Sequence, residues 1–492
     1  MKKLITTTLA TICLSSIITI SNAAVTQPSG WPDYLSMGTV SNFTDTVTNA
    51  FNDGKKVDFI FAYGAYMAGG TTADLPADPS DWNNPDDYKP VAPTSQTSTG
   101  SVNALINQAQ QISQSSKSLT QPVITLYSLN LSAGVHINGD NSPQGQYSGY
   151  YNWDQQNIIE YGLENIILNA QALTAAKPDN QDKYGVIILN PDFLGQVHTD
   201  NEQSTQFKNV DINKAVSDAL SAEGVKTQDI PTFSNDVKGF VEANNYILST
   251  YYTSVNYGWV VNTWAGGNAN FVHGSSSDVT TNVNTVDALL DDTGVYSGQY
   301  QPGFIVFDKY EANDYSALTS VQTQQGTSNV IDLGYLFNAR DMHNYLSYIG
   351  GVSSHINKPA MLWQIPGGHL IQSTDDKANP VTIGTEPDYI FGSGLSEYTP
   401  SSDVTNPAQA IPFLSSLNLD TTMPSSYNFN GGIGSYLTMD QNGNTGKYDW
   451  TEANTQELVN DNIVAVLWGG GSTTGIVDNI AQDRAADPNH PD

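Results

Sequence analysis

Short runs of consecutive apolar residues recur along the chain, and most precede a turn-rich stretch and then a helical pattern. The runs lie at 57–63, 122–128, 184–189, 257–263, 303–307, 359–365, 387–391 and 462–468. Their apolar residues are nearly continuous rather than alternating, which is typical of strands covered on both faces. The pattern therefore predicts eight parallel strands, of which the one at 387–391 is the weakest.

Helical patterns fill most of the intervals between these runs. The predicted helices cover 101–116, 153–176, 211–222, 234–250, 283–290, 332–354 and 451–460. Several begin after Asp or Ser, which accept hydrogen bonds from the first N–H groups of a helix. Eight strands with intervening helices favour a closed (β/α)8 TIM barrel. The alternative, a doubly wound open sheet, normally carries a Gly-rich phosphate turn after its first strand. The residues AYGAYMAGG at 62–70 contain no GxGxxG.

One barrel domain is expected over 24–492. The segment before it contains two lysines, a short apolar run and a small-residue end, which predicts a signal peptide at 1–23 and a secreted or periplasmic protein. No later stretch approaches the roughly 18 to 20 uninterrupted apolar residues of a membrane helix. The stretch 401–448 is rich in Asn, Gly and Ser, and predicts a long loop or small subdomain around 395–450.

Cysteine usage and charge exclude several classes of function. The single cysteine, Cys13, lies inside the predicted signal peptide, so the mature chain is expected to have neither a disulfide nor a Cys-ligated metal site. A net charge of -31 repels nucleic acid and anionic membranes. With two arginines in the chain, a phosphate site built from Arg is disfavoured. We expect a monomer without a cofactor and without a nucleic-acid partner.

The composition favours a neutral ligand that is rich in hydroxyl groups. The chain has 26 Tyr, 8 Trp and 15 Phe among many Asn, Gln, Ser and Thr residues. Aromatic faces stack on the C–H surfaces of sugars, while amides and carboxylates bind hydroxyl groups. The same composition is equally typical of exported bacterial proteins in general.

The candidate site residues follow the apolar runs, because a TIM barrel carries its chemistry at the C-terminal ends of its strands. The catalytic candidates are Asp192, Asp308 and Glu311. The candidates for substrate binding are Tyr63, Tyr127, Asn190, Trp264, Asp314, Trp363, Gln364, His369 and Trp468. Together they supply carboxylates, aromatic platforms and amides, as a carbohydrate site requires.

Paired carboxyl groups point to glycoside hydrolysis, which needs one protonated and one ionised carboxyl at the same bond. Asp308 faces the barrel interior if it alternates with Ile305 and Phe307 along the strand. A tight cluster of acids raises at least one pKa, which keeps a proton available near neutral pH. The alternative is that each acid only solvates a loop or caps a helix.

Other hydrolase classes lack their motifs in this chain. No two histidines have the HxxxH spacing of a zinc hydrolase, and no GxSxG elbow of an esterase occurs. Asp440, Asn442 and Asn444 repeat oxygen ligands as a calcium loop does. However, Thr445 replaces the usual Gly, and the acid Glu452 comes one place late. An Asn/Gly turn explains this stretch equally well, so no metal is expected.

Three strand ends carry a resemblance to a known family. They are LNPDFLG at 189–195, FDKYEANDY at 307–315 and LWQIPGGH at 362–369. In order and spacing they resemble the EPD-like, clustered-acid and WQIP-like motifs of secreted bacterial TIM-barrel proteins of the glycoside-hydrolase type. The resemblance implies an O-glycosyl hydrolase that acts on a neutral polysaccharide or oligosaccharide.

The sequence departs from that family at two places. Asn190 stands where such families often carry Glu, so only Asp192 is carried over from the EPD-like motif. The pattern of catalytic Glu residues after strands four and seven is not evident, since Trp264 and Gly392 occupy those places. The alternative is therefore a glycan-binding or surface-interaction protein on the same fold that has lost catalysis.

Overall fold

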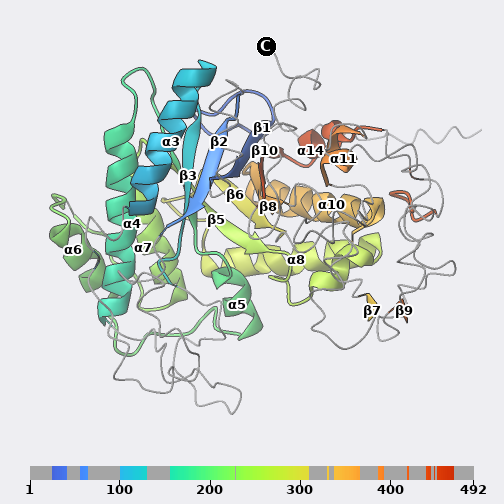
Figure 1. Cartoon of the computed structure of the whole chain (residues 1–492). Coiled ribbons are helices and arrows are strands. Elements are labelled where there is room, and N and C mark those ends of the chain that lie inside the picture. Colours follow the sequence, from blue (N-terminus) through green and yellow to red (C-terminus); the bar gives the residue numbers. More distant parts are fainter. Residues whose placement is uncertain are drawn as a thin grey trace, which may run out of the picture.

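The structure is a computed structural model, and its strands form a closed parallel barrel (Figure 1). It describes residues 25–41, 56–64, 93, 100–129, 156–227, 229–309, 330–331, 337–365, 386–392, 418–419, 439–444, 448 and 452–469. The barrel strands are β1 (Ser36–Val40), β2 (Phe59–Tyr63), β3 (Gln121–Leu126), β4 (Val186–Leu189), β5 (Asn256–Asn262), β6 (Phe304–Asp308), β8 (Ala360–Ile365) and β10 (Ile463–Trp468). They pair in this order, and β10 pairs with β1 to close the barrel. The predicted (β/α)8 class is confirmed.

Helices surround the barrel, with α3, α4 and α7 on one side and α8 and α10 on another (Figure 1). The helices expected from the sequence are α3 (Gly100–Ser116), α4 (Gln156–Ala176), α6 (Ile212–Ala222), α7 (Val237–Tyr251), α8 (Ser276–Thr293), α10 (Ala339–Ile356) and α14 (Thr455–Asn460). Further short helices are α5 (Phe193–Thr199), η2 (Ala269–His273) and α11 (Glu386–Phe391). Within the described ranges, no helix has the length and apolar character to cross a membrane.

Two strand predictions were wrong. The run at 387–391 lies in α11, where Pro387 occupies the first turn and no intrahelical N–H is required of it. The sequence pattern also missed β1, because Ser, Gly and Thr interrupt its apolar residues. Gly38 of β1 is required by packing, since a Cβ there would lie 2.3 Å from Leu467 Cδ2 and 2.7 Å from Phe59 Cβ.

The missed strand moves the count of β2 to β8 by one, whereas β10 stays the eighth strand because the run at 387–391 is a helix. β4 is the fourth strand of the barrel and β8 is the seventh. Asn190 and Asp192 therefore follow the fourth strand, and Gln364 lies in the seventh, in the places that the sequence count gave to Trp264 and Gly392. The strand FIVFD at 304–308 is the sixth strand and not the fifth.

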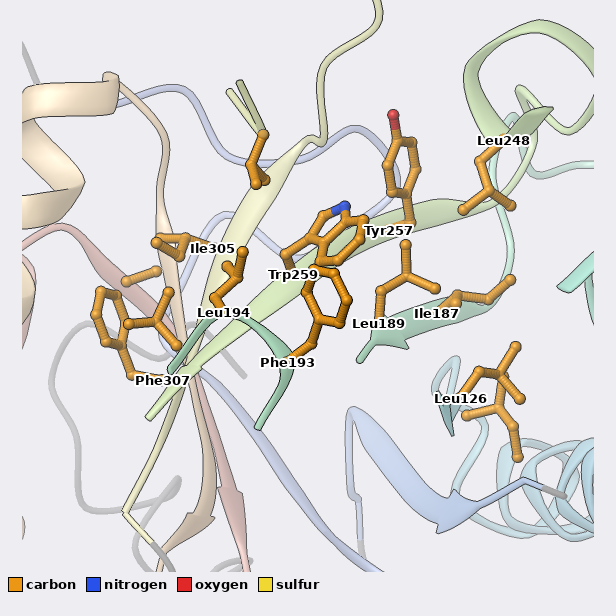
Figure 2. Close-up of a cluster of buried hydrophobic side chains, with 14 of the residues drawn as sticks. Leu126, Ile187, Leu189, Phe193, Leu194, Leu248, Tyr257, Trp259, Ile305 and Phe307 are labelled. Atoms are coloured by element: carbon orange, nitrogen blue, oxygen red, sulfur yellow. The ribbon is translucent and has the colours of Figure 1, made fainter. Parts of the chain in front are cut away.

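Apolar side chains cover both faces of the strands, as the continuous runs predict. Alternate residues of β6, such as Phe304 and Val306, belong to the cluster inside the barrel. The residues between them, Ile305 and Phe307, belong to the cluster between the barrel and the helices. Figure 2 shows part of this outer cluster, in which strands β4 to β6 meet side chains such as Leu248.

The N-terminal end of the barrel is closed by the segment before β1. The Trp31 ring lies 5.0 Å from the Phe59 ring and 4.9 Å from the Phe304 ring. Gln121 Nε2 donates to Gly30 O at 2.7 Å, and Asn256 Nδ2 donates to Ser29 O at 2.9 Å. This end is therefore filled by aromatic rings and by polar side chains bonded to the main chain.

Several predicted features lie wholly or partly outside the described residues. The signal peptide at 1–23 is among them, as is most of the predicted loop or subdomain around 395–450. In and before that stretch, the strands β7 (Val330–Ile331) and β9 (Asn418–Leu419) pair as a separate parallel sheet.

Candidate active site

Asn190 fixes the turn that follows β4. Its Oδ1 accepts hydrogen bonds from Ser128 N at 2.7 Å and Leu129 N at 3.3 Å, and its Nδ2 donates to Ser128 Oγ at 2.8 Å. The side chain is fully buried, and the backbone has φ 51°, a left-handed conformation that Asn tolerates better than most residues. Asn190 thus anchors the β4 turn to the end of β3, which places Asp192 at the rim.

Asp192 lies at the start of the short helix α5, in a left-handed conformation with φ 68°. The next residue, Phe193, is fully buried, and its ring lies 5.8 Å from the Trp259 ring and 5.6 Å from the Phe240 ring. Figure 2 shows Phe193 beside Trp259 of β5. Asn190 is held by its hydrogen bonds and Phe193 by its packing, so Asp192 between them has little conformational freedom. A left-handed conformation of a residue other than Gly stores strain, which is typical of functional sites.

Asn262 links Asp192 to Asp308. Its Nδ2 donates to Asp192 Oδ1 at 2.8 Å and to Asp308 Oδ2 at 3.2 Å. The two carboxylate oxygens therefore lie at most 6.0 Å apart, the sum of these distances. Asn262 and Asp308 are register partners at the C-terminal ends of β5 and β6. Because Phe304 and Val306 face the barrel interior, Asp308 also points inward, as the strand alternation predicts.

Burial raises the pKa of Asp192 above its ordinary value, and the hydrogen bond from Asn262 opposes this shift only in part. Asp308 is also largely buried, with 8% of its surface exposed. The site therefore holds a carboxyl group that retains its proton to higher pH, close to a second carboxyl group. A carboxyl group with a raised pKa can keep the proton that a general acid has to supply.

A β-bulge brings Trp363 and Gln364 to the same end of the barrel. Between Val466 and Trp468 the pairing of β10 with β8 shifts by one residue, and Gln364 has φ 55°. Gln364 Nε2 donates to the hydroxyl group of Tyr63, and the Tyr63 ring lies 5.6 Å from the Trp363 ring. Strict alternation would turn adjacent side chains to opposite faces, so the bulge redirects Gln364.

Trp264 follows β5 and packs against α5. A Cβ at Gly195 would lie 2.5 Å from Trp264 Cζ3, so the indole lies directly on the helix backbone. Trp264 is only partly buried, which leaves part of the ring at the surface near Asp192. Tyr127 follows β3 and is buried with 6% of its surface exposed.

The remaining candidates do not join this group. Trp468 is fully buried in the outer cluster, where its Nε1 donates to Met37 Sδ at 3.4 Å and its ring lies 6.4 Å from the Phe391 ring. It packs the barrel against α11 and faces away from the carboxyl pair, so we drop it from the site. Glu311, Asp314 and His369 lie outside the described residues.

The Asp440 loop is closed by its own hydrogen bonds. Asp440 Oδ1 accepts from Asn442 N at 2.9 Å and from Asn444 N at 2.7 Å, while Oδ2 accepts from Asn444 Nδ2 at 2.9 Å. This is the pattern of an Asx turn. Within the part of the chain that the structure describes, no group of three or more His, Cys, Asp and Glu side chains is placed to hold a metal ion.

Asn262 is among the strand-end residues that the sequence points to, but the final set of site candidates left it out. Its amide joins the two acids, yet its Oδ1 is buried without a hydrogen-bond partner. The sequence indicates this position, because Asn262 lies near the end of the run 257–263. It comes two residues after Val260 and so shares the face of the strand that Val260 occupies. A buried carbonyl oxygen without a partner costs about 1–3 kcal/mol.

Comparison with known proteins gives matches at the level of solved structures. No family model matches the chain, and no curated protein matches it. The chain is similar to GH26C from Muricauda sp. MAR_2010_75, with a TM-score of 0.36, 9% identity and coverage of 93% of this chain and 86% of that chain.

Two further solved structures are similar to the chain. One is the GH26 domain from PbGH26-GH5A endo-beta-mannanase/endo-beta-glucanase from Prevotella bryantii, with a TM-score of 0.32, 10% identity and coverage of 92% and 89% of the two chains. The other is the GH6 Orpinomyces sp. Y102 enzyme, with a TM-score of 0.29, 9% identity and coverage of 69% and 73%. A function for this chain therefore has to be argued from its own residues.

Proposed function

We propose that this protein is an exported glycoside hydrolase that cleaves a neutral polysaccharide or oligosaccharide with Asp192 and Asp308. One observation carries the proposal: the Nδ2 of Asn262 donates to both carboxylates at the C-terminal rim of the barrel. The rim also carries Trp264 as an aromatic platform and Gln364 as an amide. Glu311, three residues beyond Asp308, stays a candidate for the second carboxyl group.

The raised pKa of Asp192 suits it to the role of acid and base. In the first step Asp192 gives its proton to the glycosidic oxygen as the bond from this oxygen to the anomeric carbon breaks, and a carboxylate oxygen of Asp308 bonds to that carbon. Water then attacks the anomeric carbon, gives a proton to Asp192 and displaces Asp308. The upper limit of 6.0 Å between the two oxygens supports this retaining route, because inverting enzymes separate their carboxyl groups by about 6.5 Å or more.

Amide substitutions test the carboxyl pair directly. We expect Asp192→Asn, Asp308→Asn or Glu311→Gln, whichever removes a reacting carboxyl, to lower kcat by about 10²–10⁴-fold on soluble β-glucans or chitin oligomers. The control is Asp58→Asn, since Asp58 is also an aspartate, with 2% of its surface exposed, but lies before β2 at the N-terminal end of the barrel. Wild-type rates in all three variants would refute the proposal, and NMR of the first product anomer decides between retention and inversion.

A second function is favoured by Asn190. The family position that often carries Glu holds an amide here, and its oxygen and nitrogen are occupied by hydrogen bonds to Ser128 and Leu129. A protein that binds glycans without cleaving them would show saccharide-dependent retardation in affinity electrophoresis and release no reducing ends. The three amide variants would then bind the saccharide, and neither they nor the wild type would hydrolyse it.

Export rests on the sequence of residues 1–23. We expect the protein recovered outside the cytoplasm to begin at residue 24, which N-terminal sequencing or intact mass measurement would show. A protein that keeps residues 1–23 would contradict the predicted signal peptide.

A further inference from the structure

Asn262 has a bonding pattern that differs from that of the other Asn in β5. Asn256, at the opposite end of the strand, donates to a main-chain carbonyl, Ser29 O, at 2.9 Å. Asn262 donates to two side-chain carboxylates from the neighbouring strand ends, at 2.8 and 3.2 Å. Both residues are buried, with 3% and 2% of their surface exposed. They differ therefore in what they hold in place rather than in burial.

The orientation of the Asn262 amide follows from its neighbours. A flipped amide would direct Oδ1 at two carboxylates, which carry only acceptors when ionised. With both acids ionised, the NH₂ group faces Asp192 and Asp308, and Oδ1 is left without a partner. Since no bond to Oδ1 holds the amide, its orientation is coupled to the two carboxylates, and theirs to it.

We infer that Asn262 is the positioning residue of the carboxyl pair, setting the spacing and the orientation of Asp192 and Asp308. The inference rests on the proposed function, since it assigns a role within the same site. Each carboxylate receives one N–H of a single planar group, so a displacement of one acid changes the bond to the other. The amide is neutral at every working pH, so it joins the two acids without adding a charge.

The groups around the pair are consistent with this role. The causes of the raised pKa of Asp192 are burial, which raises it, and the hydrogen bond from Asn262, which lowers it. From β6, Asp308 shares the amide, while the ammonium of Lys309 lies 4.1 Å from the centre of the Phe337 ring. From β4 and β3, Asn190 and Ser128 present neutral groups to the turn. Asn262 is therefore the polar contact through which the proton affinity of Asp192 is adjusted.

The test compares Asn262→Ala and Asn262→Asp with Asn256→Ala. Carboxyl titrations by ¹³C NMR, with the Asp192 signal assigned from Asp192→Asn, give a measurement that needs no substrate. We expect the Asp192 midpoint to rise in Asn262→Ala because a donor is lost. It should rise further, by at least about one pH unit, in Asn262→Asp because a third carboxyl joins the pair. Asn256→Ala should titrate like the wild type.

Kinetics supply the second measurement. In Asn262→Ala we expect kcat to fall about 10- to 100-fold, because a small misplacement of a reacting group is enough for such a loss. KM should change much less, and the pH-rate profile should move with the Asp192 midpoint. In Asn256→Ala, a loss of thermal stability with an unchanged pH profile would match a purely structural role.

Two outcomes would overturn the inference. In the first, the Asp192 titration and the pH-rate profile of Asn262→Ala match those of the wild type. In the second, KM rises while the profile stays unchanged, which would make Asn262 a direct substrate contact. Failure of the proposed function is a separate result, in which Asp192→Asn and Asp308→Asn keep wild-type rates. The NMR titration would still show in that case whether Asn262 couples the two acids.

Discussion

The two ends of the barrel use the same kinds of polar side chains in different ways. At the N-terminal end, Gln121 bonds to the main chain on both sides, donating to Gly30 O and accepting from Gly185 N. At the C-terminal end, Asn262 donates instead to the side-chain carboxylates of Asp192 and Asp308. Main-chain partners cannot change their charge, whereas carboxyl partners can gain or lose a proton.

Left-handed backbone conformations occur at both ends of the barrel. Asn190, Asp192 and Gln364 lie at the C-terminal ends of β4 and β8, whereas Lys117, Asn357 and Asn462 lie shortly before β3, β8 and β10. Buried polar atoms without a hydrogen-bond partner also occur at both ends, as Trp31 Nε1 and Asn262 Oδ1 show. The comparison teaches that strain and unpartnered atoms do not separate the two ends. The difference is that one amide joins two carboxyl groups at the C-terminal end, where a barrel carries its chemistry.

The largest expected effect comes from removing the Trp31 ring at the N-terminal end of the barrel. Trp31→Ala should lower the free energy of unfolding by about 3–5 kcal/mol, because it removes a large buried ring between Phe59 and Phe304. At temperatures well below unfolding, kcat should not change. Trp264→Ala is the opposite case, with a smaller loss of stability and a raised KM. Urea denaturation measures the stability of both variants, and steady-state kinetics measure their kcat and KM. A changed kcat in Trp31→Ala would show that the N-terminal end also affects catalysis.

The buried acids at the two ends should respond in opposite directions. Asp58 accepts from Met37 N at 2.9 Å and from the Tyr34 hydroxyl at 2.8 Å. Asp58→Asn should therefore lower the free energy of unfolding by about 1–3 kcal/mol at pH 7. Asp192→Asn should not lower it, because burial disfavours the charged form of Asp192.

The pH dependence of Asp192→Asn gives the sign check. Since the folded-state pKa of Asp192 is raised, the folded protein binds this proton more tightly than the unfolded chain does, and wild-type stability falls as pH rises from the ordinary value of 3.8 through the raised one. The stability gained by Asp192→Asn should thus be small at the acid end and largest above the raised pKa. Urea denaturation at several pH values measures it, and a gain confined to low pH would contradict the assignment.

Gly195→Ala tests the contact between α5 and Trp264. The added Cβ would lie 2.5 Å from the indole, so we expect a loss of about 1–3 kcal/mol together with a raised KM, because the aromatic platform must move. Gly303→Ala is the matched control, since a Cβ there meets nothing within 4 Å. Equal effects of the two substitutions on stability and KM would show that the contact has no role in the site.

The smallest expected effect is that of Tyr63→Phe. It removes the hydroxyl that accepts from Gln364 across the barrel mouth, a hydrogen bond of about 0.5–1.5 kcal/mol. We expect a similar loss in thermal unfolding and a modest rise in KM. A loss in kcat as large as that of the amide variants would place Tyr63 among the reacting groups instead.

Much of the barrel could be predicted because its strands are buried on both faces. That burial requires continuous apolar runs, which identified β2 to β6, β8 and β10. The apolar runs could not identify β1, where contact with Phe59 and Leu467 requires Gly38 instead of an apolar side chain. Nor could the runs recognise α11, since the five residues PDYIF at 387–391 fit a short helix equally well.

The same reasoning applies to the site. Asp192 and Asp308 could be predicted because strand ends and alternation are local properties. Trp468 could not be placed correctly, since the face it occupies depends on the pairing of β10 with β1 and β8. The bulge that directs Gln364 toward Tyr63 is likewise a property of two strands together.

The sequence by itself determined the class of fold, the acids at the strand ends and the aromatic and amide character of the rim, because each depends on residue type and local spacing. The tertiary structure decided which acids meet. Asp192 and Asp308 are more than a hundred positions apart along the chain, and only closure of the barrel brings β4, β5 and β6 side by side. That arrangement places one asparagine amide between the two carboxylates, a contact that no local pattern contains.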